Sequence, residues 1–460
     1  MNRLLIAVSA IALVLSSCAT VSTPDLSDTI TTQSAESIPS NWLLPLPKTT
    51  TQAEGWASIY DDPILLEYLK LAEVQNFDLR IARTRVQEAE ANLKRSKSRL
   101  APQISGSASA GASAALRDID DPFDSYGLGL SGRWDPDIFG QTETIIDGSR
   151  AALLISEASA ADTHQAVLAQ TARTYINAVE AELLADLAKV NLEFLKESRR
   201  ISEARYRAGD SAKGDFSFAE ANYQSALFSY ENTLQGVRAA RRALSIVLGD
   251  YPVADLELAS TLNSPRSFPA RAIPASVLES RPDIIAARAR IAARVASLRG
   301  SELDAWPSIG ISGGLSSRGG FSDLFDPGDY IANLSASLAQ IIFDGGAIEA
   351  GVEAAQASLD GEVLSYEQRL RRAIGEITDA YDRAETLQRT LVNQEASSRA
   401  ANEALRLASL EYDLGESSLL DVLQVQSRVN SIDASLIRTK ASLIDTLIIA
   451  NQAVAGFDKL

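Results

Sequence analysis

The sequence predicts a mainly α-helical chain that contributes β-strands to a membrane barrel, and it predicts that this fold is built from one unit used twice. Three observations lead to this fold class. A segment near residue 80 recurs about 205 positions later, long proline-free segments have helical periodicity, and four short segments alternate apolar with polar side chains. Repeated units usually bury their apolar faces against one another, so the two halves are expected to pack side by side.

Composition and charge narrow the class. With 460 residues, of which 46% are hydrophobic, the chain is long enough for roughly two to four domains. Aromatic residues make up only 6%, which is typical of long helices that pack through small side chains. The formal net charge of −17 argues against a nucleic-acid partner, because a surface that binds phosphates needs clustered Lys and Arg.

Residues 1–17 are predicted to be a lipoprotein signal peptide. Arg3 is its positive start, and the apolar stretch Leu4–Leu15 is shorter than the roughly 20 residues of a membrane-spanning helix. Residues 15–18, Leu-Ser-Ser-Cys, resemble the lipobox of bacterial lipoproteins, and Cys18 is the only cysteine. Cys18 is therefore expected to carry covalent diacylglycerol and an N-acyl chain such as palmitate. The following Ala19 implies, as in lipoproteins of enteric-type bacteria, transport to the outer membrane. An ordinary signal peptide with an incidental cysteine is the alternative.

The organisation after the signal peptide follows the repeat. Residues 18–60 are predicted to be an extended, lipid-anchored tether because they are rich in Ser, Thr and Pro. The first repeat is placed at 61–255, a linker at 256–273, the second repeat at 274–456 and a short tail at 457–460.

Each repeat is expected to open with a short helix and a longer one. In the first repeat, Asp61-Asp62-Pro63 is a helix-start signal, and the longer helix covers Asp78–Leu100, before Pro102. In the second, a short helix follows Pro274, and Pro282 begins a helix that ends near Trp306.

Four segments then have the period of two that is typical of strands: 103–115, 126–137, 308–317 and 330–342. They are expected to form two hairpins joined by the acidic loops Arg117–Asp124 and Arg318–Asp329. Strands of about ten residues with one apolar and one polar face are the signature of a transmembrane barrel, although each segment alone also fits a soluble hairpin. Four strands cannot close a barrel, so several copies of the chain would have to close it together.

The longest helices are predicted after the hairpins. No proline interrupts Glu143–Tyr206 or Ala347–Tyr412, and each helix would approach about 100 Å in length. Gly209 and Gly415 are expected to end them in tight turns, followed by return helices to Gly249 and Gly456. An apolar stripe at coiled-coil spacing predicts how the first of them packs. The stripe consists of Ala169, Ala172, Ile176, Val179, Leu183, Leu187, Val190 and Phe194.

With these features in order, the chain resembles the outer-membrane efflux channels of the TolC/OprM type, in the NodT-like lipoprotein branch that serves resistance-nodulation-division pumps. The resemblance rests on Arg281-Pro282-Asp283, on residues 137–140 (Asp-Ile-Phe-Gly), on residues 342–346 (Ile-Phe-Asp-Gly-Gly) and on residues 412–423 (Tyr-Asp-Leu-Gly-Glu-Ser-Ser-Leu-Leu-Asp-Val-Leu). It implies a homotrimer, a twelve-stranded barrel with four strands per chain, and a long periplasmic helical tunnel.

The same resemblance implies the partners and the gate. The helix tips would meet a periplasmic membrane-fusion adaptor, and through it an inner-membrane proton-driven pump. The tip residues are Tyr206, Gly209, Tyr412, Leu414, Gly415 and Ser417. An acidic ring at the periplasmic mouth would fall on Asp421, with Asp215 as its first-half counterpart and Gln424 where some members carry a second acid. Three copies of Asp421 would repel anions. Asp421 could equally be an acid that stabilises a helix N-terminus, and the two roles are compatible.

No catalytic, cofactor or metal site is predicted. The only histidine, His164, is expected to be a solvated residue on a helix, and one Cys with one His cannot form Cys/His catalysis or a histidine-based zinc site. The chain is therefore not expected to be an enzyme, although a hydrolase that uses carboxylates alone stays open.

The function that fits these features is a passive outer-membrane exit channel of a tripartite efflux system for drugs and other toxic small molecules. The first alternative is the outer-membrane duct of a type I, ABC-linked protein secretion system. A lipid-anchored periplasmic coiled-coil scaffold is the second, but it would leave the four alternating strands unexplained.

Overall fold

The structure is a computed structural model that describes Tyr60 and residues 62–115, 118–253, 255–263, 274–321 and 323–454. The chain divides into two units, 1–38 and 39–460, and all described residues belong to the second. The predicted signal peptide, Cys18, the tether up to residue 59 and the tail 457–460 lie outside the described residues.

The first repeat begins with α3 (Pro63–Gln75) and α4 (Phe77–Lys97), which a 3₁₀ turn extends over Ser98–Leu100. The side chain of Asp62 caps α3 by accepting hydrogen bonds from the backbone N–H groups of Ile64 and Leu65 at 3.0 and 3.1 Å. Pro63 stands at the first helical position, where its missing N–H leaves no bond unmade. Local capping chemistry therefore sets the helix start that the sequence predicts.

The two longest helices are α5 (Gln141–Ala208) and α9 (Ala347–Asp413), of 68 and 67 residues. At 1.5 Å per residue each is about 100 Å long, as expected. Their return helices are α6 (Lys213–Leu248) and α10 (Leu419–Ala453), and α10 ends three residues before the predicted Gly456. The second repeat opens with α7 (Pro274–Ser280) and α8 (Pro282–Leu303). None of the helices in the described ranges is both long and apolar enough to cross a membrane.

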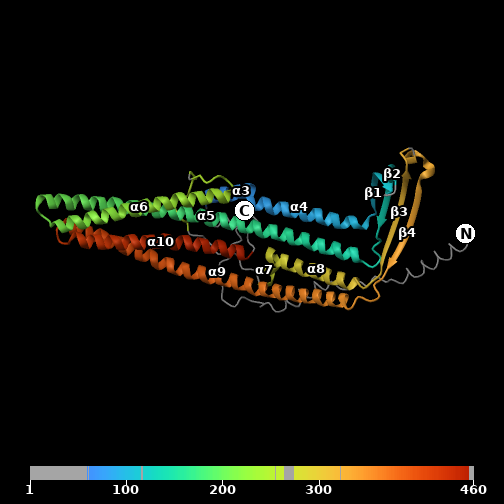
Figure 1. Ribbon diagram of the computed structural model, residues 1–460. Helices are drawn as coiled ribbons and strands as arrows, with labels where there is room; N and C mark the ends of the chain where they lie inside the picture. The colour runs from blue at the N-terminus through green and yellow to red at the C-terminus, as the bar shows by residue number, and fades with distance from the viewer. Residues whose placement is uncertain are drawn as a thin grey trace. The chain divides into compact units, whose positions relative to one another are not determined.

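The helices pack in equivalent ways in the two repeats. Helices α6 and α4 follow one another along α5, and α10 and α8 follow one another along α9 (Figure 1). Contacts of α5 with α8 and with α10 join the repeats. The expectation that the two halves pack side by side is confirmed.

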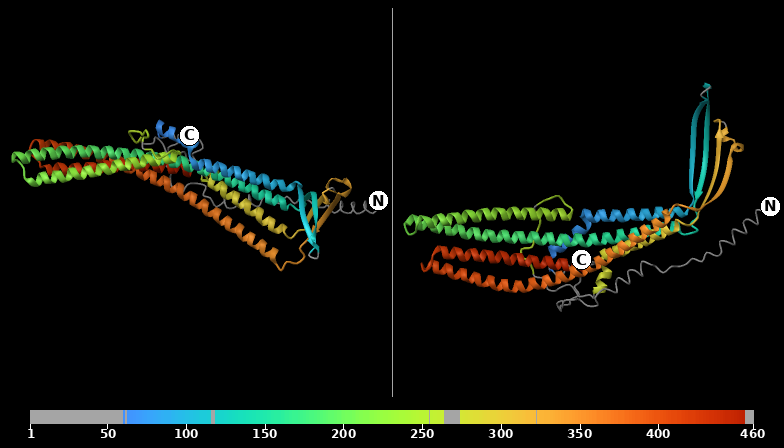
Figure 2. Two further views of the ribbon diagram at one scale, coloured as in Figure 1. Left: turned by 45° about the horizontal axis from the view of Figure 1, so that its top comes forward. Right: turned by 60° about the horizontal axis from the view of Figure 1, so that its bottom comes forward.

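The strands form one antiparallel sheet in the order β1-β2-β3-β4, seen apart from the helices in Figure 2. The strands are β1 (Gln103–Ala115), β2 (Asp118–Trp134), β3 (Ser308–Gly319) and β4 (Ile331–Ala339). The predicted loop Arg117–Asp124 is wrong, because β2 already begins at Asp118 and Phe123 and Asp124 pair with Ser113 and Ala112. The backbone of β1 continues the ladder beside these acidic residues, and pairing with a neighbouring strand outweighs their low strand propensity.

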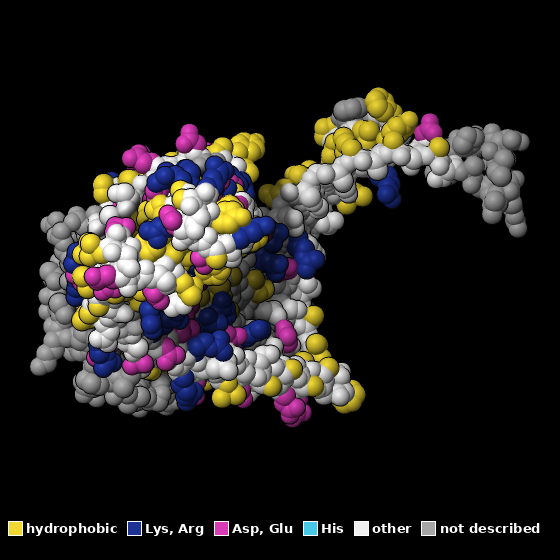
Figure 3. Space-filling model, turned by 90° about the vertical axis from the view of Figure 1, so that its left-hand side faces the viewer, with side chains coloured by type: hydrophobic (Ala, Val, Ile, Leu, Met, Phe, Trp, Pro, Cys, Tyr) yellow, Lys and Arg dark blue, Asp and Glu magenta, His cyan; other side chains and the backbone are white. Residues whose placement is uncertain are grey.

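The strand register places the apolar side chains on one face of the sheet. Leu130 lies opposite Leu315, and Trp134 lies opposite Ile311. On the other face, Ser105 and Ser131 are hydrogen-bonded at 2.9 Å, and Ser312 and Ser335 at 2.8 Å. Hydrophobic side chains gather on one side of this sheet in Figure 3. The predicted alternation thus separates a hydroxyl-rich face from an apolar one.

The hydrophobic core lies where the short and long helices meet. One buried cluster joins α3, α5 and α10 around Leu69, Tyr175 and Ile448, and a second joins α9 and α10 around Ile377 and Leu447. The predicted stripe on α5 is buried at Ala169, Ala172, Ile176 and Val179, but Val190 farther along is 65% exposed. The stripe therefore packs within the chain over only part of its length.

Candidate functional site at the helix turns

The two turns that connect the long helices to their return helices have the same backbone. Gly209 and Gly415 adopt φ angles of +83° and +80°, which residues with a side chain rarely adopt. The N–H of Asp210 donates to the carbonyl of Arg205 at 2.9 Å, and the N–H of Glu416 donates to the carbonyl of Glu411 at 2.8 Å. Both predicted turn glycines are therefore at turns that close α5 and α9.

The turns differ at the start of the return helices. Ser418 and Asp421 form a capping box: the N–H of Asp421 donates to Ser418 Oγ at 3.3 Å, and the N–H of Ser418 donates to Asp421 Oδ2 at 3.1 Å. The hydroxyl of Ser418 also donates to Asp421 Oδ2 at 2.7 Å. In the first half Ala212 stands at the cap position of α6 and makes no side-chain bond, with Asp215 in the first turn.

The capping box also sets the charge of Asp421. Hydrogen bonds from the hydroxyl and the backbone N–H of Ser418 hold the pKa of the Asp421 carboxyl below its usual value. Asp421 and Asp215 are both exposed. The structure thus supports the helix-terminus role of Asp421 and leaves its carboxylate at the surface of the turn. The motif Ser-x-x-Asp is a capping signal that sequence reasoning could have read but did not.

The predicted tip residues fall into two groups. Tyr206 stacks on Phe216 with ring centroids 6.1 Å apart, and Leu414 is exposed. Tyr412 is buried, because the guanidinium of Arg205 lies 4.5 Å from the centre of its ring. Ser417 donates a hydrogen bond to the carbonyl of Ala408 at 3.4 Å. The contact of Arg205 with Tyr412 brings the two turns together and was not predicted.

A groove lined by uncharged side chains, both polar and apolar, runs between α5, α6 and α10 behind the turns, with a volume of about 490 Å³. Gln424 lines it together with amide and hydroxyl groups of the three helices, and Gln426 Nε2 donates to Asn191 Oδ1 at 3.2 Å. Figure 3 views the molecule from the turns, where cationic and acidic side chains are interspersed. Gln424 therefore lies in an uncharged groove, one turn of helix after Asp421.

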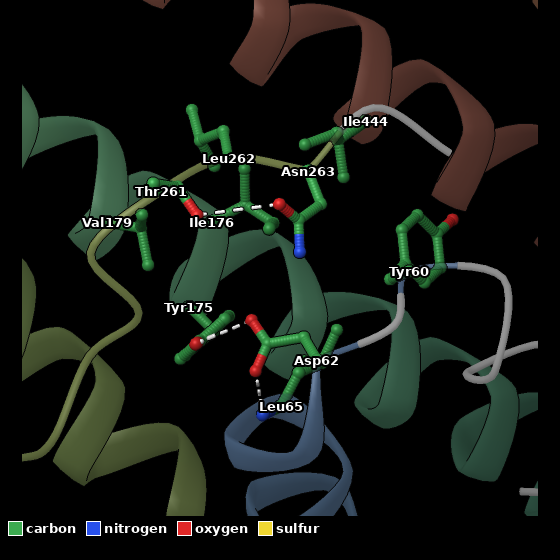
Figure 4. A pocket seen from close by; sticks show the side chains of 10 residues that line it. All are labelled: Tyr60, Asp62, Leu65, Tyr175, Ile176, Val179, Thr261, Leu262, Asn263 and Ile444. Carbon is green, nitrogen blue, oxygen red and sulfur yellow. Dashed lines mark hydrogen bonds between the residues drawn. The ribbon is translucent and has the colours of Figure 1, made fainter. Parts of the chain in front are cut away.

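A second polar cluster lies in the core, and Figure 4 shows the bond between Tyr175 and Asp62 at its centre. The hydroxyl of Tyr175 donates to Asp62 Oδ2 at 2.7 Å and accepts from the N–H of Ala259 at 3.2 Å. The hydroxyl of Tyr68 donates to the carbonyl of Glu257 at 2.9 Å. The cavity beside Tyr175 measures only about 10 Å³, so it is not a ligand site. The cluster fastens the segment after α6 to the core.

The other sequence expectations concern chemistry. His164 lies on helix α5 with 34% of its side chain exposed, and its Nε2 lies 2.8 Å from a carboxylate oxygen of Glu73 on α3, a contact that was not predicted. The contact arises because α3 folds back on α5, which the sequence around His164 cannot indicate. Among the described residues no group of His, Cys, Asp and Glu could hold a metal ion.

Comparisons with known proteins agree with this architecture. The family model described as "Outer membrane efflux protein" matches residues 68–250 and 273–452. The chain is 27% identical over 410 residues to Nodulation protein T of Rhizobium leguminosarum bv. trifolii, covering 87% of both proteins. It is 26% identical to the Cation efflux system protein CusC of Escherichia coli K12, covering 86% of this chain and 85% of CusC. Its fold is similar to the open state of the Neisseria gonorrhoeae MtrE outer membrane channel, with a TM-score of 0.81, 23% identity, and coverage of 92% of this chain and 96% of MtrE.

Proposed function

The chain belongs to the outer membrane efflux protein family, and we propose on this basis that it is the passive outer-membrane exit channel of a tripartite efflux system. The channel conducts small molecules from the periplasm or an inner-membrane pump to the outside. The two relatives are a nodulation protein and a cation efflux system protein, which does not favour the protein-secretion alternative.

The open sheet is the observation that carries the proposal. Strands β1 and β4 are edges of the sheet, and Leu334 on the apolar face is 83% exposed. Open edges are not tolerated in lipid, because unpaired backbone groups cost several kcal/mol each there (~2–7). Pairing of β4 with β1 of the next copy removes both edges. Three copies then make a barrel of twelve strands with the hydroxyl-rich face inside, a lumen suited to polar solutes.

The location and the partners follow from this arrangement. Cys18, once acylated, anchors the chain in the outer membrane, and the long helices extend into the periplasm. The periplasmic adaptor meets the two turns at the exposed Tyr206, Gly209, Leu414 and Gly415 and at the half-buried Ser417, and Tyr412 supports them from inside. The energy comes from the inner-membrane proton-driven pump that the adaptor connects to the channel.

The turns also form the periplasmic gate. Asp421 is ionised at neutral pH, as an ordinary aspartate is, and Ser418 lowers its pKa further, so three copies form a ring of negative charge. Asp215 adds a second carboxylate per copy, and Gln424 continues the wall without charge. Such a ring attracts cations, repels anions and narrows the entrance when the turns approach one another.

Conductance of the purified trimer in planar bilayers tests both the channel and the gate. Asp421→Ala is expected to raise the current and reduce cation selectivity, and Asp215→Ala/Asp421→Ala to do so further. Ser418→Ala is the matched control, because it also breaks the capping box, including the bond from the Ser418 hydroxyl to Asp421 Oδ2, but keeps the Asp421 carboxylate.

Equal effects of Ser418→Ala and Asp421→Ala would assign Asp421 to the cap alone and contradict the charge ring. Open currents that no variant changes would place the constriction elsewhere. A stable trimer that never conducts would contradict the channel itself.

A further inference from the structure

Equivalent helices of the two repeats differ in how many neighbouring helices cover them. Helices α4, α5, α8 and α9 pack in this lateral order, so α5 and α8 have neighbours on both sides, whereas α4 and α9 are at the two ends of the layer. The internal repeat makes α4 the equivalent of α8, at an offset of 205 residues, and α5 the equivalent of α9, at an offset of 206. The α5–α8 contact within the chain is therefore a template for a contact between α9 and α4.

Burial of equivalent residues identifies the uncovered faces. Ala286 on α8 faces a neighbour and is 3% exposed, whereas its equivalent on α4, Ile81, is 47% exposed. Ala158 on α5 is 6% exposed, whereas its equivalent on α9, Leu364, is 66% exposed. The same holds for three further pairs, in which the first residue is buried and the second is exposed: Ala289 and Thr84, Ala296 and Ala91, Ala151 and Ala357.

In the proposed function the helical tunnel closes when α9 of each copy packs against α4 of the next copy with the geometry of the α5–α8 contact. We propose that a charge pair between copies specifies this interface. The proposal rests on the assembly of several copies in the proposed function. It adds which residues meet and why this edge recognises a second copy of the chain.

Near its start, α5 makes ion pairs along its own length that have no counterpart at the equivalent described residues of α9. On α5, Glu143 and Asp147 form ion pairs with Arg150 of the same helix. Their equivalents on α9 are Glu349 and Glu353, but Gln356 replaces the arginine. Glu349 and Glu353 are exposed and, within the described residues, have no ion-pair partner.

Cationic side chains that could pair with Glu349 and Glu353 of another copy lie near the end of α4. Lys94, Arg95, Lys97 and Arg99 occupy the positions where α8 has Arg299, Gly300, Glu302 and Asp304. All four are exposed, and the described part of the chain provides no ion pair for them. In the template, a Cβ at Gly300 would lie 3.5 Å from Thr144 Oγ1. Arg95 therefore lies against Ala350 of the next copy, beside Glu349 and Glu353.

Engineered cysteines in the full-length acylated protein test the contact. In the template, a Cβ at Gly148 would lie 4.0 Å from Ala296 Cβ, which is within the range of a disulfide. The equivalent pair between copies is Ala354→Cys with Ala91→Cys, which is expected to give cross-linked dimers and trimers on non-reducing gels. The matched control, Gly148→Cys with Ala296→Cys, is expected to cross-link within one chain and to keep the monomer's size.

The single variants Ala354→Cys and Ala91→Cys control for cross-links through Cys18. Each of them alone is expected to stay monomeric on the gel. A trimer that conducts but gives no cross-link from the Ala354→Cys/Ala91→Cys variant overturns this interface and leaves the channel intact. Failure of any trimer to form would instead contradict the proposed function.

Charge reversal tests the pairing itself. Arg95→Glu and Glu349→Lys/Glu353→Lys are each expected to lower the temperature at which the trimer dissociates in detergent, and combining them is expected to restore it. Reversals that leave the trimer unchanged, or that fail to rescue one another, overturn the charge pair. An unchanged trimer with weaker binding of the Arg95→Glu variant to phosphatidylglycerol vesicles would assign these cations to lipid and overturn it too.

Discussion

The first repeat fastens the start of α4 with an amide, whereas the second repeat fastens the start of α8 with a guanidinium. Asn76 Nδ2 donates to the carbonyl of Val247 near the end of α6 at 2.7 Å. At the equivalent place Arg281 Nη1 donates to the carbonyl of Ala453 at the end of α10 at 3.0 Å. In both repeats one side chain joins the start of a strand-connected helix to the end of a return helix.

The two joints differ in electrostatics. Arg281 is also bonded to both carboxylate oxygens of Asp283 at 3.0 Å and to Glu376 on α9 at 2.9 Å. Its side chain is only 11% exposed, so these charges interact more strongly than a surface pair would. Asn76 instead caps its own helix, by accepting from the N–H groups of Asp78 and Leu79. One duplicated joint is thus neutral and joins two helices, α4 and α6, and the other ties three helices together through charge.

The largest effect is expected from breaking the charged joint. Arg281→Met would leave Asp283 and Glu376 without their cation and should lower the free energy of unfolding by about 3 kcal/mol. Asn76→Ala removes neutral hydrogen bonds and should cost about 1 kcal/mol. Thermal unfolding of both variants followed by circular dichroism measures the difference. Equal losses would show that charge adds nothing to this joint.

The next effect concerns the segment after α6, which reaches the core of the first repeat. Tyr175→Phe removes the hydroxyl that bonds Asp62 and Ala259, and it should cost about 1–2 kcal/mol. It should also make the chain easier to cleave within 255–263 by limited proteolysis. Tyr68→Phe, which loses a single bond to Glu257, is the smaller reference change. Unchanged proteolysis in both variants would show that other contacts hold this segment.

A smaller effect is expected from making the two turns alike. Ser418→Ala should destabilise α10 by about 1 kcal/mol, because it removes the cap. Ala212→Ser should stabilise α6 by a similar amount, since it supplies the cap that the first half lacks. Amide hydrogen exchange in the first turns of α6 and α10 measures both. A loss of protection at α6 in Ala212→Ser would contradict the equivalence of the turns.

The smallest effect is expected from pH. The pKa of Asp421 is lowered in the folded chain, so its ionised carboxylate stabilises the fold above the ordinary carboxyl pKa of about 4. This stabilisation is lost as the pH falls through the lower pKa of the folded chain, and the carboxylate keeps its charge above that value. Cation selectivity of the channel should therefore stay constant between pH 8 and pH 5. A change within that range would show that the three carboxylates share protons across the ring.

Local chemistry in the sequence determined the elements and their order. Helical period, alternation and the glycines of the turns depend on neighbouring residues, so the long helices α5 and α9, the strands β1 and β3 and the turns at Gly209 and Gly415 could be predicted. The duplication further indicated that the two repeats pack alike. The confirmed fold class follows from these local signals together with the repeat.

Only the tertiary structure decided which side chains meet across the chain. Arg281 reaches Ala453, His164 reaches Glu73, and Arg205 covers Tyr412, over separations that no periodic pattern reports. The early start of β2 has the same origin. The acidic residues at its start have low strand propensity, and they form a strand because β1 supplies the hydrogen-bonding partners. Periodicity specifies which face of an element is apolar, but the geometry of packing decides which particular residues that face touches.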